Sequence, residues 1–282
     1  METLLEKYRA HLMSQYKEVS TLKSYVHEVE SFLQWCGGRH TDLSTVTQDT
    51  LIEFRDAMIA KGAKVATVNK TVSTLSTFFK WAQNEGLAGG NFARHIRLRT
   101  DKKEAAPRWL TPDEVTALLE VVAKEPSAFM RARNEAIIYI MLFSGLRVEE
   151  VSQLRIDSVD DERLHVYDHD TVVRSVPMTE PTRLKVAAWI EFRLKAVKQV
   201  HMDSRSLFVT ERSGNMQPRS IQFVVEAYEE KLLFPVTSQT LRNTFCRRLV
   251  EDGASIERLK ELAGHKSVLT SFKYYGSPLV KI

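Results

Sequence analysis

The chain has few cysteines and no long apolar stretch. Only two of its 282 residues are cysteines, Cys36 and Cys246, and they lie far apart in segments with helical patterns. This pattern excludes a disulfide framework and favours free thiols in a reducing compartment. Neither cysteine has a histidine or cysteine neighbour at the spacing of metal ligands, so no zinc site is indicated.

The longest apolar run, residues 136–143, is too short to cross a membrane, and no signal peptide is recognisable. We therefore expect a soluble, cytoplasmic protein without a membrane partner. The chain length suits two domains, and a hydrophobic content of 43% is sufficient for ordinary cores.

Acidic residues are nearly absent from one part of the chain. Residues 57–100 contain seven lysines and arginines but only one acid, Glu85, so this window carries +6 while the whole chain carries only +4. The isoelectric point near 8.9 is only mildly basic. Such a window is typical of a surface that neutralises phosphates. The alternative is a solvated basic face that has no partner.

Residues 1–98 predict a bundle of four or five helices. Apolar residues recur at helical spacing in segments that begin near Leu4, Leu22, Leu51 and Val68. On the fourth helix, small polar groups and one lysine are expected to face away from the apolar stripe and to approach a DNA backbone. These residues are Thr67, Asn69, Lys70, Thr71, Ser73 and Thr74. Further candidate DNA-binding residues are Lys80, Arg97 and Arg99.

A charged segment without periodicity, residues 99–108, predicts a linker to a second domain over 109–282. Thr111 and Pro112 begin a helix there, as N-cap and first helical residue. Residues 164–178 alternate and predict a hairpin that turns at His169 and its two aspartate neighbours, and 206–209 form a candidate third strand. We therefore predict a mainly α fold with a small antiparallel sheet in the second domain.

Arg147 follows a glycine at the start of a short predicted helix, and Glu150 lies one turn further on. An arginine at a helix N-terminus is unfavourable unless an anion or a carboxylate compensates its charge. We interpret Arg147 as a phosphate ligand that Glu150 orients. The alternative is a plain surface arginine.

The last 45 residues, 238–282, contain three short helical segments. Ser238 is the candidate N-cap of the first, and Gly253 marks its end. The second begins at Ser255 and stops at Gly264, so His265 lies just beyond a helix C-terminus.

Ser267 is the candidate cap of the third segment. Within it, Val268, Phe272 and Tyr275 form the stripe that should face the core. Tyr274 should then point to the opposite side and have the more accessible hydroxyl.

These motifs resemble the tyrosine recombinase (phage integrase) family, of the Xer and transposon resolvase type. The matches are Ser144-Gly145-Leu146-Arg147-Val148-Glu149-Glu150, Gln239-Thr240-Leu241-Arg242, Ala263-Gly264-His265, and Tyr274 nine residues after that histidine. The resemblance implies an N-terminal helical core-binding bundle followed by an α-rich catalytic domain. It also implies that Arg147 and Arg242 clamp the scissile phosphate and that His265 hydrogen-bonds it or assists Tyr274.

In the family, the tyrosine attacks the phosphate and forms a 3′-phosphotyrosyl link without a metal, so the resemblance implies no cofactor. The resemblance therefore implies a double-stranded DNA partner with an inverted-repeat core site and a Holliday junction intermediate. It implies a homotetramer on DNA and a monomer when free, encoded by a bacterium, phage or transposon for integration, excision or resolution. Only eight residues follow Tyr274, which is too short for the docking helix of many relatives.

Two positions depart from the family pattern. The family's hairpin lysine, which protonates the leaving oxygen, aligns with His169, and no lysine occurs over residues 156–184. His169 or Arg174 is the candidate substitute acid. Gln239 replaces the family's histidine or lysine, and its amide can hold a phosphate oxygen but cannot transfer a proton.

The departures leave room for other functions. One alternative is a catalytically silent relative that only binds DNA. Another is strand relaxation of the type IB topoisomerase kind, although the helical N-terminal bundle favours recombination. The last is an α-rich structural module whose motifs match by coincidence.

Overall fold

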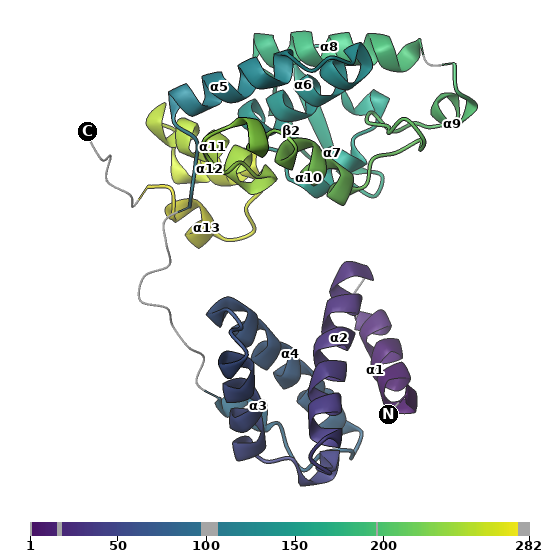
Figure 1. Ribbon diagram of the computed structural model, residues 1–282, viewed down its shortest axis with the longest axis vertical. Helices are drawn as coiled ribbons and strands as arrows, with labels where there is room; N and C mark the ends of the chain where they lie inside the picture. The colour runs from purple at the N-terminus through teal and green to yellow at the C-terminus, as the bar shows by residue number, and fades with distance from the viewer. Residues whose placement is uncertain (1, 16–18, 97–106, 196, 276–282) are drawn as a thin grey trace. The chain divides into compact units, whose positions relative to one another are not determined.

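The computed structural model describes residues 2–15, 19–96, 107–195 and 197–275 (Figure 1). The chain divides into two compact units, Met1–Glu104 and Ala105–Ile282. Arg97 and Arg99 lie outside the described residues, as does most of the predicted linker. No helix in the described ranges is long and apolar enough to cross a membrane.

The N-terminal unit is a helical bundle, as predicted. Its elements are α1 (Glu2–Gln15), α2 (Val19–Gly37), η1 (Leu43–Thr45), α3 (Gln48–Ala60), α4 (Val65–Asn84) and η2 (Phe92–His95). Aromatic rings fill the core, where Phe32 meets Phe54 and Phe79 edge to face, with ring centres 5.2 and 5.8 Å apart. Cys36 is a free thiol buried in this core.

The polar face predicted for α4 is partly wrong. Thr71 and Thr74 are only 4% and 2% exposed. Thr71 lies three residues after the buried Val68, and Thr74 lies four residues before the buried Phe78, so both fall within the apolar stripe of the helix. A threonine methyl group packs in a core much as a valine does, and polarity alone therefore misplaced these two residues.

The second unit is mainly helical and contains one hairpin. Its elements are α5 (Pro112–Ala123), α6 (Ala128–Phe143), α7 (Val148–Gln153), η3 (Ile156–Ser158), β1 (Arg163–Asp168), β2 (Thr171–Pro177), α8 (Glu180–Leu194), α9 (Gln199–Met202), α10 (Pro218–Glu226), η4 (Glu229–Lys231), α11 (Ser238–Glu251), α12 (Ile256–Ala263) and α13 (Val268–Phe272). The first helix begins as predicted, because Thr111 caps it reciprocally with Glu114 and Pro112 occupies the first turn.

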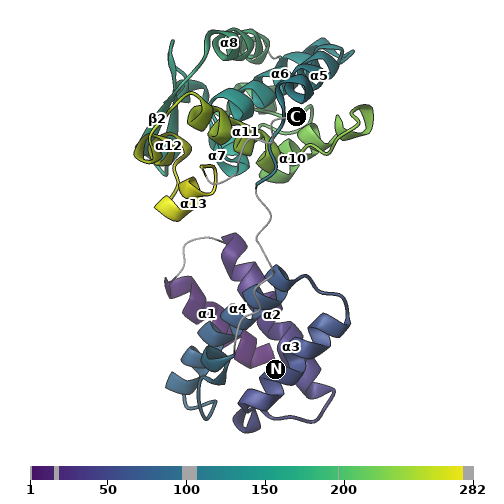
Figure 2. The ribbon, with the colours of Figure 1, turned by 90° about the vertical axis from the view of Figure 1, so that its left-hand side faces the viewer.

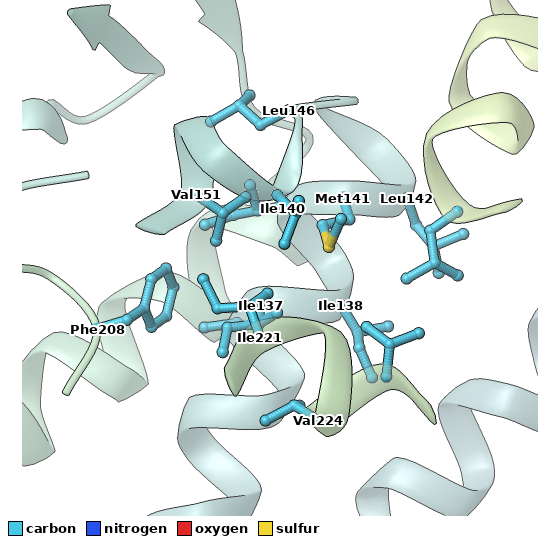
Figure 3. Close-up of a cluster of buried hydrophobic side chains, with 14 of the residues drawn as sticks. Ile137, Ile138, Ile140, Met141, Leu142, Leu146, Val151, Phe208, Ile221 and Val224 are labelled. Atoms are coloured by element: carbon cyan, nitrogen blue, oxygen red, sulfur yellow. The ribbon is translucent and has the colours of Figure 1, made fainter. Parts of the chain in front are cut away.

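Helix α6 runs through the middle of this unit's core. Figure 3 shows its side chains, from Ile137 to Leu142, surrounded by Val151 of α7, Phe208, and Ile221 and Val224 of α10. The apolar faces of these elements bury one another, which holds α7 and α11 in fixed positions against α6. The residues at the start of α7 and along α11 are thereby fixed in space.

The hairpin forms where the alternating pattern predicts it. Strands β1 and β2 pair antiparallel from Arg163 opposite Pro177 to Asp168 opposite Thr171. The expected third strand is wrong: in the described chain, Ser206 makes only an isolated bridge to Arg155. The next main-chain bonds of this segment go elsewhere, from Leu207 to Leu154, so it does not extend the sheet. Figure 2 shows β2 next to α12.

The caps of the last helices differ from prediction at one position. Thr237, not Ser238, caps α11, because its extended backbone lets the side-chain oxygen accept from the Thr240 amide at 3.1 Å. Ser255 caps α12, and Gly264 ends it in the left-handed conformation with φ 63°, both as predicted.

Gly145 gives a test of how tightly α6 and α11 pack. Its φ is 63°, and an added Cβ would lie 2.0 Å from a Phe245 ring carbon. Gly145→Ala should lower the free energy of unfolding by about 3 kcal/mol, from backbone strain plus overpacking. Gly253→Ala is the control: its φ is 81° but nothing lies within 4 Å, so only the strain of about 1 kcal/mol applies. Urea unfolding measures both, and equal losses would contradict this account.

Candidate active site

Three arginines converge on the C-terminus of α12. Each donates a hydrogen bond to one of three consecutive main-chain carbonyls: Arg174 to Leu262 at 3.2 Å, Arg242 to Ala263, and Arg147 to Gly264. The last carbonyls of a helix have no partner within the helix and carry partial negative charge. They therefore attract the guanidinium groups, which come from β2, α11 and the start of α7.

Glu150 is the carboxylate of this cluster. Arg174 binds it in two contacts of 2.6 and 2.7 Å, and Arg147 adds a side-chain bond of 2.8 Å and a main-chain bond of 2.7 Å. Burial would raise the pKa of Glu150, but the hydrogen bonds and charges of Arg174 and then Arg147 hold it below its usual value. The predicted pairing of Arg147 with Glu150 is present. One carboxylate among three guanidiniums leaves a net positive site.

Arg242 is the most buried of the three arginines, at 4% exposed. It donates to the carbonyls of Gly145 and Ala263, so its hydrogen-bond acceptors are neutral. Burial, followed by the charge of Arg147, lowers the pKa of Arg242, although Cys246 and Glu150 oppose the shift. An anion arriving at this site would neutralise a charge that the protein itself compensates only partly.

His265 follows Gly264 directly and is 7% exposed. Its Nδ1 shares a hydrogen bond of 2.9 Å with the Ser271 hydroxyl. Burial and then the charge of Arg242 lower its pKa to about 4, so the imidazole is neutral at physiological pH. Its ring stacks on that of Tyr274, with the centres 6.0 Å apart.

Tyr274 is buried, which contradicts the predicted orientation of the paired tyrosines. It is 4% exposed, while Val268 and Phe272 of the expected core stripe are 47% and 58% exposed. The reason is that α13 ends at Phe272, so both tyrosines lie in a turn where helical spacing no longer applies. Tyr275 is half-buried, and its hydroxyl donates to the Ala254 carbonyl at 2.6 Å.

The Tyr274 hydroxyl is held by groups on α11. It donates to Asn243 Oδ1 at 2.8 Å. Burial raises its pKa, and the neighbouring Cys246 thiol adds to the shift. Cys246 is itself buried and free, and burial raises its pKa as well. The resting phenol is therefore fully protonated at neutral pH.

Gln239 reaches Tyr274 only through Asn243. Its Nε2 donates at 2.8 Å to the same Oδ1 that accepts from the tyrosine. Sequence reasoning missed Asn243. Its position supplies a signal, because it lies four residues after Gln239 on one face of α11 and directly follows Arg242.

The contacts of His169 are with residues outside this cluster. It occupies the hairpin turn with φ 54°, and its side chain is 79% exposed, 3.8 Å from the Asp168 carboxylate. Arg155 donates to its carbonyl at 3.2 Å. Arg174, the other candidate acid, is instead held on Glu150.

The candidate DNA-binding residues of α4 differ in exposure. Thr67, Lys70, Ser73 and Lys80 are exposed, and Asn69 is half-buried. Lys70 forms an ion pair with Glu28 at 2.8 Å, so its charge is already partly compensated. Lys80 borders a polar groove of about 760 Å³ in the N-terminal unit.

The lowered pKa of His265 makes stability depend on pH. Between about 6.5 and 4, the unfolded chain binds a proton at this residue and the folded chain does not, so stability falls as pH falls. We expect the stability of wild type relative to His265→Asn to decrease by about 2 kcal/mol between pH 7 and 4.5. Urea unfolding of both proteins at both pH values measures this, and a constant difference would disprove the shift.

Comparison with known proteins agrees with this geometry. Residues 108–278 match the phage integrase family, and residues 5–86 match the phage integrase N-terminal SAM-like domain. Among curated proteins, the chain is 28% identical over 260 residues to tyrosine recombinase XerC of Thermodesulfovibrio yellowstonii, covering 90% of this chain and 84% of the relative. It is 27% identical over 278 residues to tyrosine recombinase XerA of Pyrococcus furiosus, covering 96% and 88%.

A solved structure of the Tn1549 transposon integrase in complex with circular intermediate DNA has the same fold. Its TM-score is 0.76 at 19% identity, over 98% of this chain and 96% of that one. The match over residues 108–278 takes in the three arginines, His265 and Tyr274 and covers more than half of the chain. This chain is therefore an enzyme of the phage integrase family of tyrosine recombinases.

Proposed function

We propose that this chain cuts and rejoins DNA at specific sites through a covalent bond between Tyr274 and a DNA 3′-phosphate. One observation carries the proposal: three guanidiniums converge on the end of α12, beside the stacked rings of His265 and Tyr274. Guanidinium groups bind non-bridging phosphate oxygens in paired contacts and stay charged at any physiological pH. The names of the relatives, which are tyrosine recombinases, support the same reaction.

In the cleavage step, the Tyr274 oxygen attacks the scissile phosphorus and the bond to the 5′-oxygen breaks. The phenol loses its proton as the new bond forms, and the departing oxygen gains one, which leaves a 3′-phosphotyrosyl link and a 5′-hydroxyl. Arg147 and Arg242 stabilise the added charge on the phosphorane. Neutral His265 can hydrogen-bond the phosphate or accept the proton of the phenol.

Rejoining reverses these roles. The 5′-hydroxyl of a partner strand attacks the phosphotyrosyl link, and Tyr274 leaves with a proton. Because the covalent link stores the energy of the phosphodiester bond, the cycle consumes no cofactor.

The substrate in this proposal is a pair of inverted sites, held by four copies of the chain and exchanged through a Holliday junction. The chain shares its fold with a transposon integrase in complex with circular intermediate DNA, which supports a role for a mobile element.

The leaving oxygen needs a proton donor, and His169 is the one we propose. Arg174 is excluded because a guanidinium does not give up its proton at physiological pH, and this one is fixed on Glu150. His169 projects from the hairpin tip with most of its side chain in solvent, so it is free to approach DNA bound against the cluster.

The exposed residues Thr67, Ser73 and Lys80 of α4 are proposed to contact the DNA backbone.

A second candidate function is that of a catalytically silent relative, which binds DNA without cutting it. Its specific support is the resting position of Tyr274, whose hydroxyl is buried on Asn243. Gln239 also supports this function, because it stands where the family has a residue that can transfer a proton.

Covalent trapping on a nicked suicide substrate, made from the inverted repeat beside the gene, tests the nucleophile. We expect wild type to form a protein–DNA adduct, Tyr274→Phe to form none, and Tyr275→Phe to form it at a similar rate, since the Tyr275 hydroxyl donates to the Ala254 carbonyl, away from the arginines. Electrophoresis under denaturing conditions measures the adduct. Wild type that binds this DNA without any adduct would establish the silent relative instead.

His169→Ala tests the proton donor. We expect unchanged DNA binding and about 100-fold slower cleavage, the usual cost of losing a general acid. A substrate with sulfur in place of the leaving 5′-oxygen needs no proton, so on it the variant should cleave like wild type. His165→Ala is the control, because that ring bonds Ser175 across the hairpin and Asp160 just before it. Normal cleavage of the oxygen substrate by His169→Ala would remove this role.

A further inference from the structure

The Asn243 side chain joins three parts of the second unit. Its Oδ1 accepts from the Tyr274 hydroxyl at 2.8 Å and from Gln239 Nε2 at 2.8 Å. Its Nδ2 donates to the main-chain carbonyl of Arg108 at 2.9 Å. Asn243 is 6% exposed, so water competes little for these bonds.

These partners determine which way the amide faces. A main-chain carbonyl can only accept, so the edge of Asn243 that faces Arg108 must be the NH₂ group. The carbonyl edge then faces Tyr274. Gln239 reinforces this orientation, because its NH₂ group donates to the same oxygen.

The orientation controls how Tyr274 presents its oxygen. An amide oxygen only accepts hydrogen bonds, so the phenol proton must point toward Asn243. The phenol lone pairs are then directed away from it. The ring is fixed as well, by stacking on His265 and by the bond of 3.0 Å from Arg247 to the Tyr274 carbonyl. The Tyr274 hydroxyl, which could otherwise rotate about its C–O bond, thereby has one resting direction.

We propose that Asn243 is a positioning residue that sets the direction of the Tyr274 hydroxyl for attack, and that Gln239 acts through it. The inference rests on the proposed function. Asn243 takes no proton, since a neutral amide is not a base at physiological pH; the proton that the phenol releases on attack passes to His265, as in the proposed cleavage step. The role given to Gln239 thus differs from that of a residue that contacts the phosphate.

The chain offers a matched control one residue further along α11. Thr244 is buried, accepts from the Leu110 amide at 2.9 Å and donates to the Thr240 carbonyl, so it also ties α11 to the start of this unit. It has no hydrogen bond to Tyr274. Asn243→Leu and Thr244→Val each keep the side-chain volume and remove the polar atoms.

The test is the rate of adduct formation at saturating suicide substrate, with DNA affinity and melting temperature measured for every variant. We expect Asn243→Leu to keep its DNA affinity and to form the adduct about 100-fold more slowly, because small misplacements of a nucleophile cost this much. Thr244→Val should lose a similar amount of melting temperature and keep a nearly normal rate. Gln239→Leu should slow the reaction less and add nothing to Asn243→Leu.

Asn243→Asp separates positioning from structure through its pH profile. An ionised carboxylate still accepts from Tyr274 and can also take its proton, so the rate should rise with pH through a carboxyl titration that wild type lacks. The titratable and charged neighbours of the hydroxyl, Cys246, His265 and Arg242, are present in both proteins. This variant also answers the question if Asn243→Leu does not fold.

The outcomes are distinct. An adduct in wild type that Tyr274→Phe loses establishes the reaction before Asn243 is tested. Given that result, a normal rate in Asn243→Leu, or equal slowing in Asn243→Leu and Thr244→Val, overturns the inference and leaves the proposed function intact. An Asn243→Asp profile identical to that of wild type also overturns it. Absence of the adduct in wild type overturns the proposed function itself.

Discussion

The candidate site depends on the C-terminal end of one short helix. Helix α12 stops at Gly264, and the left-handed turn there leaves the carbonyls of Leu262, Ala263 and Gly264 pointing outward as acceptors. Side chains from three other elements meet at these oxygens. Without this end, three buried or half-buried guanidiniums would have Glu150 as their main compensation, and their mutual repulsion would push them apart. The helix end therefore allows positive charge to be concentrated where a phosphate can bind.

A second constraint acts on the nucleophile. Tyr274 is held in a dry environment that keeps its phenol protonated, although the same burial brings it beside the arginines. The structure thus combines a site prepared for an anion with a tyrosine that is unreactive at rest. Arrival of DNA would change the first condition, since a bound phosphate neutralises the cluster.

Local signals in the sequence predicted much of this arrangement. The N-cap at Thr111, the stop at Gly264 and the hairpin turn at His169 depend on neighbouring residues, and all three form. Charge logic at a helix start also predicted the pairing of Arg147 with Glu150. The failures arise where spacing along the chain does not determine the contacts. The five-residue α13 is too short for periodicity to orient Tyr274. The role of Asn243 depends on its bond to Arg108, which is distant in sequence and contacts it only in the folded chain.

The acceptors that gather the arginines belong to the main chain, and this affects how the site can change over time. A substitution at position 262 or 263 alters a side chain but leaves the carbonyl oxygen in place. Those positions can therefore drift in sequence as long as the helix persists, whereas position 264 cannot, because a Cβ there would lie 2.7 Å from Arg174. The carbonyl acceptors of the site are in this way protected from side-chain substitution, because the shape of the backbone alone places them.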